Sequence, residues 1–424
     1  MSGIQQVDAA RGWRMVLRRF SALFAGELGA RVLGFVIVLV LATRLGPAGF
    51  GIVTFGLTLV AWCSYVVDAG TEILNVREIA RRPDRFRHIS ERVLGLRLTL
   101  SVIAAALFVA GAWLLARSDI TRETLVLFAL LLPAGALNLR WMVLGVGGSR
   151  AIALGLVLSR LLVLAAVVLL VMDESELKRV PVIEAGGTLI YALVILWLVG
   201  GGLRRLRPRV DLAAWRETLR QSTPLMITGF ARSAVVSFDV VLIQLALGPG
   251  DLGIYSLASR HAFFVTGAVG LFSMAFLSAF SATADEGAVA LKGRALRWAF
   301  GCAVLVAAAL SVGALLIPSI YGDEYERSVA VLAVIAWRIP LAVLASVYGS
   351  ILVARDRQVD LMRNSIIAAV FVVCADLVAV LAFGLLGAAV VSIAGGALTY
   401  VLNARSVRRV APELGGRALR TVER

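Results

Sequence analysis

Twelve apolar stretches restrict what this chain can fold into, because most of them are long enough to cross a lipid bilayer as a helix. They cover residues 20–43, 50–74, 92–116, 124–146, 150–172, 181–202, 221–246, 252–279, 295–317, 329–354, 363–383 and 386–403. With 60% hydrophobic residues, the chain has little sequence left for a soluble domain. It is therefore expected to be an all-α polytopic membrane protein with about twelve transmembrane helices. A cytoplasmic enzyme, a disordered regulator and a secreted disulfide scaffold are excluded.

Cysteine and histidine are scarce, and they give no sign of a metal or cofactor site. Cys63, Cys302 and Cys374 each lie inside an apolar stretch, where cysteine behaves as a small hydrophobe. His88 and His261 are the two histidines of the chain. No GxxxxGK[ST] motif for nucleotide binding occurs, and no loop is long enough for an ATPase. We therefore expect neither a cofactor nor a metal.

Basic residues gather in the loops on one side of the predicted membrane. Arginines are frequent before the first stretch, after the second, in the connection 204–220 and in the tail 404–424. Acidic residues collect in the opposite loops, around Asp173 and Asp323. By the positive-inside rule, both termini are cytoplasmic and the chain is a multi-pass protein of the cell inner (plasma) membrane. The net charge of +15 therefore needs no nucleic-acid partner.

An internal repeat divides the chain. LGPAGFGI at 45–52 recurs as LGPGDLGI at 247–254, an offset of 202 residues, and each copy predicts a tight turn between two helices. The repeat predicts two pseudo-symmetric six-helix lobes that enter the membrane in the same direction, as a parallel repeat. The substrate site is expected between them. The predicted organisation is an N-terminal cytoplasmic segment 1–19, a first lobe 20–203, a basic cytoplasmic linker 204–220, a second lobe 221–403 and a basic cytoplasmic tail 404–424.

Arginines inside the apolar stretches indicate a cavity that their own side chains line. An arginine at the centre of a membrane helix costs about 2.5–3.5 kcal/mol on insertion scales, so it is expected to face a cavity or a partner. Guanidinium binds phosphate oxygens through two parallel hydrogen bonds and stays charged, which favours a phosphate-binding cavity. Arg97, nearer a helix end, is expected to snorkel to the surface. The candidate cavity residues are Arg31, Arg140, Arg160, Arg232, Arg260 and Arg338.

Acids in the same stretches have two open interpretations, ion coupling or pairing with the arginines. The helical spacing of Glu27 with Arg31, and of Arg232 with Asp239, predicts that each pair shares one helix face. The candidates for ion coupling or for charge pairing are Glu27, Asp68, Asp239 and Asp376.

Two prolines interrupt otherwise continuous apolar stretches. Pro133 lies in the fourth stretch and Pro340 in the tenth, shortly after Arg338. Proline removes a backbone donor and clashes with the preceding turn, so both helices are expected to kink or break.

The stretch ATRLGPAGFGIVTFGLTLVAWCSYVVDAGTEILNVREIARRPDRF at 42–86 resembles the N-terminal signature of the oligosaccharide and polysaccharide flippases. These are relatives of the multidrug and toxin extrusion (MATE) exporters in the multidrug/oligosaccharidyl-lipid/polysaccharide (MOP) exporter superfamily. The resemblance implies a MATE-like fold with a V-shaped central cavity. It also implies that a polyprenyl diphosphate-linked oligosaccharide crosses from the inner to the outer leaflet for cell-surface polysaccharide biosynthesis. By position, Arg31, Arg232 and Arg260 match the cationic residues that meet the diphosphate in this family. Lipid II flippases of the same superfamily have two further spans, which this chain lacks.

The resemblance also implies partners: membrane lipid, and as candidates the glycosyltransferases and the polymerase that handle the glycan. Two other functions compete with a flippase. A multidrug or cation antiporter of the MATE type is expected to have a cavity dominated by acids, whereas arginines outnumber acids within these stretches. A membrane glycan polymerase or ligase generally needs a sizeable outer loop, and the outer connections here are short. We therefore expect a transporter and not an enzyme.

Overall fold

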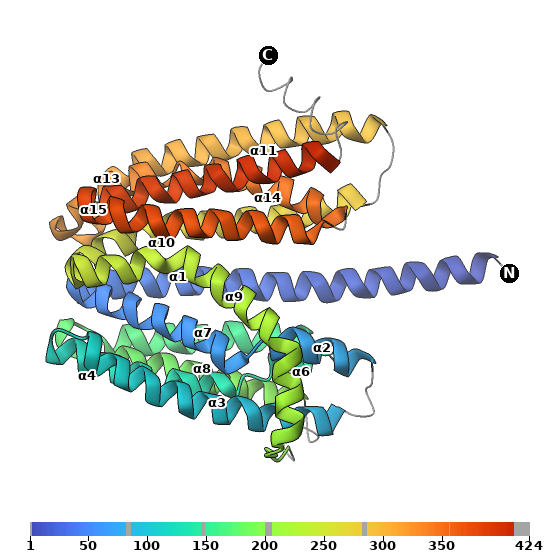
Figure 1. Cartoon of the computed structure of the whole chain (residues 1–424), viewed down its shortest axis with the longest axis horizontal. Coiled ribbons are helices and arrows are strands. Elements are labelled where there is room, and N and C mark those ends of the chain that lie inside the picture. The colour runs from blue at the N-terminus through green and yellow to red at the C-terminus, as the bar shows by residue number, and fades with distance from the viewer. Residues whose placement is uncertain are drawn as a thin grey trace. The chain divides into compact units, whose positions relative to one another are not determined.

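The computed structural model describes residues 2–81, 86–145, 149–199, 206–281, 286–355 and 357–410, which are nearly all helical (Figure 1). Within these helices, the side chains of residues 2–23, 268–281 and 286–295, of Arg232 and of several other single positions are not described. No strand occurs in these ranges. The predicted all-α fold class is confirmed.

The chain divides into two compact units. Unit 1 comprises Met1–Leu45 and Phe55–Ser233, and unit 2 comprises Gly46–Thr54 and Ala234–Arg424. Unit 1 holds most of α1 (Ser2–Asp68), α2 (Thr71–Arg81), α3 (Phe86–Leu115), α4 (Asp119–Phe128), α5 (Leu131–Ala136), α6 (Arg140–Gly145), α7 (Ser149–Leu170), α8 (Arg179–Val199) and the start of α9 (Leu212–Ala246). Unit 2 holds the rest of α9, α10 (Pro249–Ser281), α11 (Glu286–Gly313), α12 (Ile317–Tyr321), α13 (Glu326–Ile335), α14 (Arg338–Ala354) and α15 (Gln358–Val410).

Helix lengths account for the predicted number of passes. Eight segments of the described chain are long and apolar enough to cross a membrane. Two of them, Phe24–Asp68 and Gln358–Arg409, are 45 and 52 residues long and are interrupted at Gly46 and Gly384, where the chain doubles back (Figure 1). Each of these segments therefore supplies two passes, because about 20 residues span the bilayer core. α9 and α10, with 35 and 33 residues, are long enough to add two more, so the described part of the chain agrees with about twelve passes.

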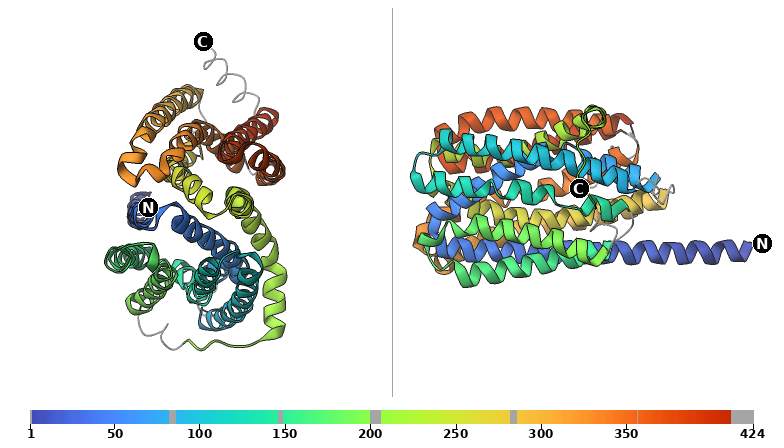
Figure 2. Two further views of the ribbon diagram at one scale, coloured as in Figure 1. Left: turned by 90° about the vertical axis from the view of Figure 1, so that its left-hand side faces the viewer. Right: turned by 90° about the horizontal axis from the view of Figure 1, so that it is seen from below.

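Each unit packs as a helical bundle with its own contacts. In unit 1, α7 packs against α8, and the two green helices lie side by side in Figure 2. The short α5 packs against both α3 and α8. In unit 2, α14 packs against α10, α11 and α15. A buried apolar cluster in unit 1 includes Ile79, Met142 and Ile195, and one in unit 2 includes Val347, Leu352 and Val407.

Both proline-containing passes are broken, as predicted. The fourth pass is divided into α4, α5 and α6, with Pro133 in α5. The tenth is divided into α13 and α14, with Pro340 in the first turn of α14. Arg140 and Arg338 are the first residues of α6 and α14, so each break presents an arginine at the start of the next helix.

Glycines make the two predicted turns of the repeat. Gly46 has φ 60° and Gly248 has φ 97°, which lie in the left-handed region that glycine adopts without strain. Pro47 and Pro249 follow directly, and a proline at the first helical position has its φ already fixed for a helix. The tight turns predicted at both copies are confirmed.

The two copies of the repeat also touch each other in a reciprocal way within unit 2. A Cβ atom added to Gly51 would overlap the carbonyl oxygen of Pro249, and one added to Gly253 would overlap the carbonyl oxygen of Pro47. These residues occupy equivalent positions in the two copies. Only glycine allows backbones to approach this closely, so the repeat specifies a backbone contact as well as a turn.

Replacing Gly253 by alanine is therefore expected to lower the free energy of unfolding by about 1–3 kcal/mol, the range for overpacked sites. Thermal unfolding of the purified protein in detergent measures this. Gly250 is the matched control, because it lies on the same turn of α10 and a Cβ there meets nothing within 4 Å. Equal melting temperatures for Gly253→Ala and Gly250→Ala would show that the contact carries no such constraint.

Candidate functional site

Arg140 is the centre of a charged cluster in unit 1. Its Nη2 atom donates a hydrogen bond of 2.6 Å to Oε1 of Glu27 on α1. Its Nε atom lies 3.9 Å from Oε1 of Glu72, near the start of α2. The side chains of Arg140 and Glu27 are about one third exposed, at 30% and 29%. A predicted cavity arginine is thus held between two carboxylates from two helices.

Arg97 is the second cation of this cluster, and the prediction that it snorkels is wrong. The residue is 4% exposed, and its guanidinium pairs directly with Asp68. Its Nε atom donates to Oγ1 of Thr71 at 2.9 Å, and its Cζ lies 5.4 Å from the ring centre of Trp141. The carboxylate and the aromatic face together stabilise the charge where it is buried, which removes the need to reach the surface.

Glu27 and Arg31, which are expected to share one helix face, do not form an ion pair with each other. Glu27 pairs with Arg140 instead, because α6 brings a guanidinium within 2.6 Å of it. Arg31 is exposed, and it has no ion-pair partner among the described residues. Among the described residues, α1 therefore presents a guanidinium without an ion-pair partner.

Arg160 forms a separate ion pair in unit 1. Its Nη1 atom lies 3.0 Å from Oε2 of Glu184 and so joins α7 to α8. Next to it, Ser159 donates to the carbonyl of Gly187 across the same two helices. The two charges of this pair therefore compensate each other, although the Arg160 side chain is 38% exposed.

A second cluster of charged groups lies in unit 2. Tyr255 of α10 donates its hydroxyl hydrogen to Oδ2 of Asp239, and Oδ1 of Asp239 accepts from the backbone of Val240 at 2.8 Å. Arg338 donates to Oγ of Ser392 at 3.0 Å and stacks over the ring of Phe263 at 4.7 Å. The Arg338 and Asp239 charges attract each other.

Asp376 completes the unit 2 cluster from α15. It is 2% exposed, and its Oδ1 atom has no hydrogen-bond partner among the described residues. Its carboxylate repels that of Asp239. Two acids therefore accompany Arg338 in this cluster.

The remaining predicted arginines lie on α9 and α10. Arg260 is half-buried on α10. Arg232 lies on α9, and its side chain is outside the described residues. Ser237 has non-helical angles (φ −133°, ψ 20°) and interrupts the helix between Arg232 and Asp239. The prediction that Arg232 and Asp239 share one helix face is therefore wrong, because the helix is not regular between them.

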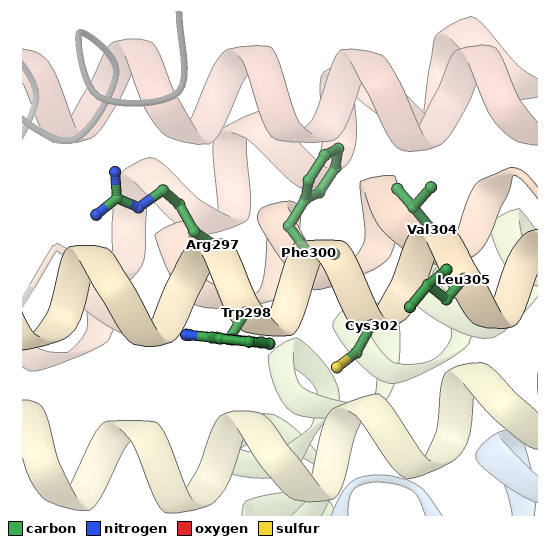
Figure 3. Close-up of a pocket in the computed structure, with 7 residues that line it drawn as sticks. Arg297, Trp298, Phe300, Cys302, Val304 and Leu305 are labelled. Carbon is green, nitrogen blue, oxygen red and sulfur yellow. The ribbon is translucent and has the colours of Figure 1, made fainter. Parts of the chain in front are cut away.

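A groove of about 720 Å³ runs along α11 in unit 2 (Figure 3). Arg297 and Trp298 lie at one end of the row, and the rest of the lining is apolar apart from the Cys302 thiol. Its described lining residues are Arg297, Trp298, Phe300, Gly301, Cys302, Val304 and Leu305. Sequence reasoning missed the groove, because these residues are ordinary for a membrane span.

Two tyrosines in the clusters also escaped the sequence analysis. Tyr191 is 6% exposed, and its hydroxyl has no hydrogen-bond partner among the described residues. Tyr255 donates a hydrogen bond to the carboxylate of Asp239. A tyrosine within an apolar stretch is a weak signal on its own, because its ring packs like any other aromatic side chain.

Comparison with solved structures identifies the fold. The chain is similar to a lipid II flippase, MurJ, in an inward closed conformation (TM-score 0.71, 13% identity, 94% of this chain and 90% of that chain). It is also similar to an inward-facing multidrug resistance MATE family transporter of the MOP superfamily (0.65, 15%, 91% and 95%). A MOP superfamily transporter from Pyrococcus furiosus matches as well (0.56, 14%, 94% and 96%). A search of the curated proteins finds no match.

A family profile identifies the family. The profile described as "Polysaccharide biosynthesis protein" matches residues 16–283, which is more than half of the chain. This range contains all of the predicted N-terminal signature and the start of unit 2. The chain is a multi-pass membrane protein with the MOP transporter fold, and it belongs to the polysaccharide biosynthesis protein family.

Proposed function

We propose that the protein is a flippase for a polyprenyl diphosphate-linked oligosaccharide, which it moves from the inner to the outer leaflet for cell-surface polysaccharide biosynthesis. In this proposal, two lobes expose an arginine-lined cavity alternately to each side of the membrane. The match to the polysaccharide biosynthesis protein family supports a role in polysaccharide biosynthesis. The observation that carries the substrate class is Arg31, an exposed guanidinium on a membrane helix without an ion-pair partner among the described residues. Such a group suits a diphosphate, because it binds phosphate oxygens and stays charged.

The six predicted arginines do not contribute equally to the proposal. Arg140 and Arg160 have carboxylate partners at 2.6 and 3.0 Å, so a diphosphate would have to displace Glu27 or Glu184 to bind them. The proposal therefore assigns the diphosphate to Arg31, with the arginines of α9, α10 and α14 as further contacts. These further contacts are Arg232, Arg260 and Arg338.

The acids divide in a similar way. Glu27 and Asp68 are partners of Arg140 and Arg97. Asp239 and Asp376 outnumber Arg338 in the unit 2 cluster, and they remain our candidates for ion coupling in that unit.

The proposed orientation places both termini in the cytoplasm and the protein in the inner membrane. It follows from the excess of arginine in one set of loops. On the other side, Asp173 accepts hydrogen bonds from the Ser175 hydroxyl and backbone, which hold the pKa of Asp173 below its usual range. This loop therefore stays negatively charged at neutral pH.

A cation antiporter is the second candidate, because the fold is shared with multidrug transporters. For the similar transporter from Pyrococcus furiosus, a binding pocket of reverse polarity suggests a different function. In the present chain, the surplus acid of the unit 2 cluster is the observation that favours a cation. The polarity of the ligand therefore separates the two candidates.

A binding measurement tests the proposal. Purified protein in detergent is titrated with a polyprenyl diphosphate, a polyprenol of equal length and a lipophilic cationic drug, and binding is followed by native mass spectrometry. We expect the diphosphate to bind at least about tenfold more tightly than the polyprenol, because one charge-assisted hydrogen bond contributes about 1.5–3 kcal/mol. Tighter binding of the cationic drug than of the diphosphate would overturn the flippase proposal in favour of the antiporter.

A further inference from the structure

The groove along α11 lies opposite the side of that helix that packs on α14. Ala303 of α11 packs with Val343 of α14 in a buried apolar cluster. Gly301 lines the groove two residues away from Ala303, which places it on the opposite side of the helix at about 100° per residue. Trp298 and Leu305, which also line the groove, are 76% and 70% exposed. An exposed apolar surface of this kind marks a site for a partner or a membrane lipid.

Gly301 gives the groove its depth. A Cβ atom added to this glycine meets nothing within 4 Å among the described residues, so the floor of the groove is open. Phe300 and Trp298 project to opposite sides of α11 and form the two walls (Figure 3). Val304 and Leu305 continue the lining further along the helix. An open floor between apolar walls suits a linear apolar chain, such as the acyl chain of a lipid.

One end of the groove is polar and basic. The guanidinium of Arg297 and the indole nitrogen of Trp298 lie at the same end of the row (Figure 3). Both groups donate hydrogen bonds, and a guanidinium binds phosphate oxygens through two parallel ones. Lys292 and Arg294 precede them in the sequence, and residues 287–322 contain no acid. The charge of this part of the chain therefore complements an anion.

The polar end lies at the depth of the lipid headgroups. Arg297 and Trp298 are at the start of Leu296–Tyr321, a segment long and apolar enough to cross a membrane. Arginine and tryptophan are typical of this depth, because their polar ends reach the headgroups while the rest of each side chain stays among the acyl chains. The proposed orientation places this end on the cytoplasmic side, where basic pockets bind anionic headgroups.

We propose that this groove binds an anionic glycerophospholipid of the inner leaflet. Its phosphodiester accepts hydrogen bonds from Arg297 and Trp298, and one acyl chain lies along Gly301 towards Leu305. A phosphodiester carries a single negative charge, which matches the one guanidinium of the described lining. A zwitterionic phospholipid offers the same phosphate, but Arg297 repels its cationic headgroup. The choice of leaflet rests on the proposed orientation, whereas lipid binding rests on neither the orientation nor the proposed transport function.

Cys302 provides a readout inside the groove. Its thiol is exposed, as is that of Cys374 on α15, which lies outside the described lining. Purified protein in detergent is titrated with dioleoylphosphatidylglycerol or dioleoylphosphatidylcholine, and the alkylation rate of each thiol is measured by mass spectrometry of its peptide. We expect the anionic lipid to protect Cys302 at about fivefold lower concentration than the zwitterionic lipid, because one arginine near a headgroup contributes about this factor. Alkylation of Cys374 should not depend on the headgroup.

Two pairs of variants test the two parts of the site. Arg297→Gln is expected to remove the preference for the anionic lipid, whereas Arg405→Gln, an equal loss of charge at an exposed position on α15, keeps it. Gly301→Leu fills the floor of the groove, so neither lipid should protect Cys302 at the concentrations that protect it in the parent. Gly313→Leu is the matched control, because Gly313 lies on the same helix and a Cβ there also meets nothing within 4 Å.

The outcomes decide between the possible occupants of the groove. Equal protection of Cys302 by the two phospholipids, or a preference that survives in Arg297→Gln, overturns the anionic site. A polyprenyl diphosphate that protects Cys302 at lower concentration than phosphatidylglycerol assigns the groove to the proposed substrate and overturns the phospholipid assignment. None of these measurements involves translocation, so the lipid site and the flippase proposal fail separately.

Discussion

Replacing Arg97 by alanine is expected to lower the free energy of unfolding by about 3–5 kcal/mol, the range for removing one partner of a buried ion pair. The substitution leaves the carboxylate of Asp68 without its direct partner. It also removes the hydrogen bond to Thr71 and the contact with the ring of Trp141. Chemical unfolding of the purified protein, followed by a thiol-reactive dye or by circular dichroism, measures the change.

Two variants test the cause of this loss. Asp68→Asn removes the unpaired charge, so the Arg97→Ala, Asp68→Asn double variant is expected to recover most of the stability. Arg92→Ala is the matched control on the same helix, because its pair with Glu78 is long and partly exposed, and such pairs contribute about 0–1 kcal/mol. If Arg97→Ala were as stable as Arg92→Ala, the buried pair would have no structural role.

Replacing Arg31 by alanine is the second large effect, and it acts on transport. We expect translocation of a polyprenyl diphosphate oligosaccharide to fall by about ten- to a hundredfold, because about 1.5–3 kcal/mol of charge-assisted hydrogen bonding is lost. Folding is expected to change little, since Arg31 is exposed and has no ion-pair partner among the described residues. Arg31→Lys keeps the charge without the bidentate fork and should give an intermediate rate.

The control for Arg31→Ala is a pair of membrane charges that balance each other. The Arg160→Gln, Glu184→Gln double variant removes the ion pair between α7 and α8 while keeping the net charge of the bundle. We expect it to transport at close to the parent rate. Equal losses in Arg31→Ala and in this double variant would mean that any charge removed from the bundle impairs transport, and that Arg31 has no special role with the diphosphate.

The sequence predicted the features that depend on local chemistry. Apolar length alone indicated the number of passes, because a bilayer sets the length of a helix. Glycine and proline located the turns at Gly46 and Gly248 and the breaks near Pro133 and Pro340, because these residues restrict or free the backbone locally.

Pairing between charges was not predictable in the same way. Spacing along one helix favoured Glu27 with Arg31, yet the partner of Glu27 is Arg140, which is distant in sequence and arrives on α6. Arg97 is buried for the same reason, since Asp68 and Trp141 come from other helices. The spacing of residues along a helix predicts which of them share a face. The ion-pair partner that a residue finds on another helix depends instead on how the helices pack.

Translocation by the parent protein in liposomes tests the central claim most directly. Two fluorescent lipids with the same glycan and the same isoprenoid chain are compared, one with a diphosphate linkage and one with a neutral linkage, and a membrane-impermeant quencher reports the leaflet. The account predicts that the diphosphate lipid crosses rapidly in liposomes that contain the protein, and that the neutral lipid stays in its leaflet. Equal movement of both lipids, or movement of neither by a folded protein, would contradict it.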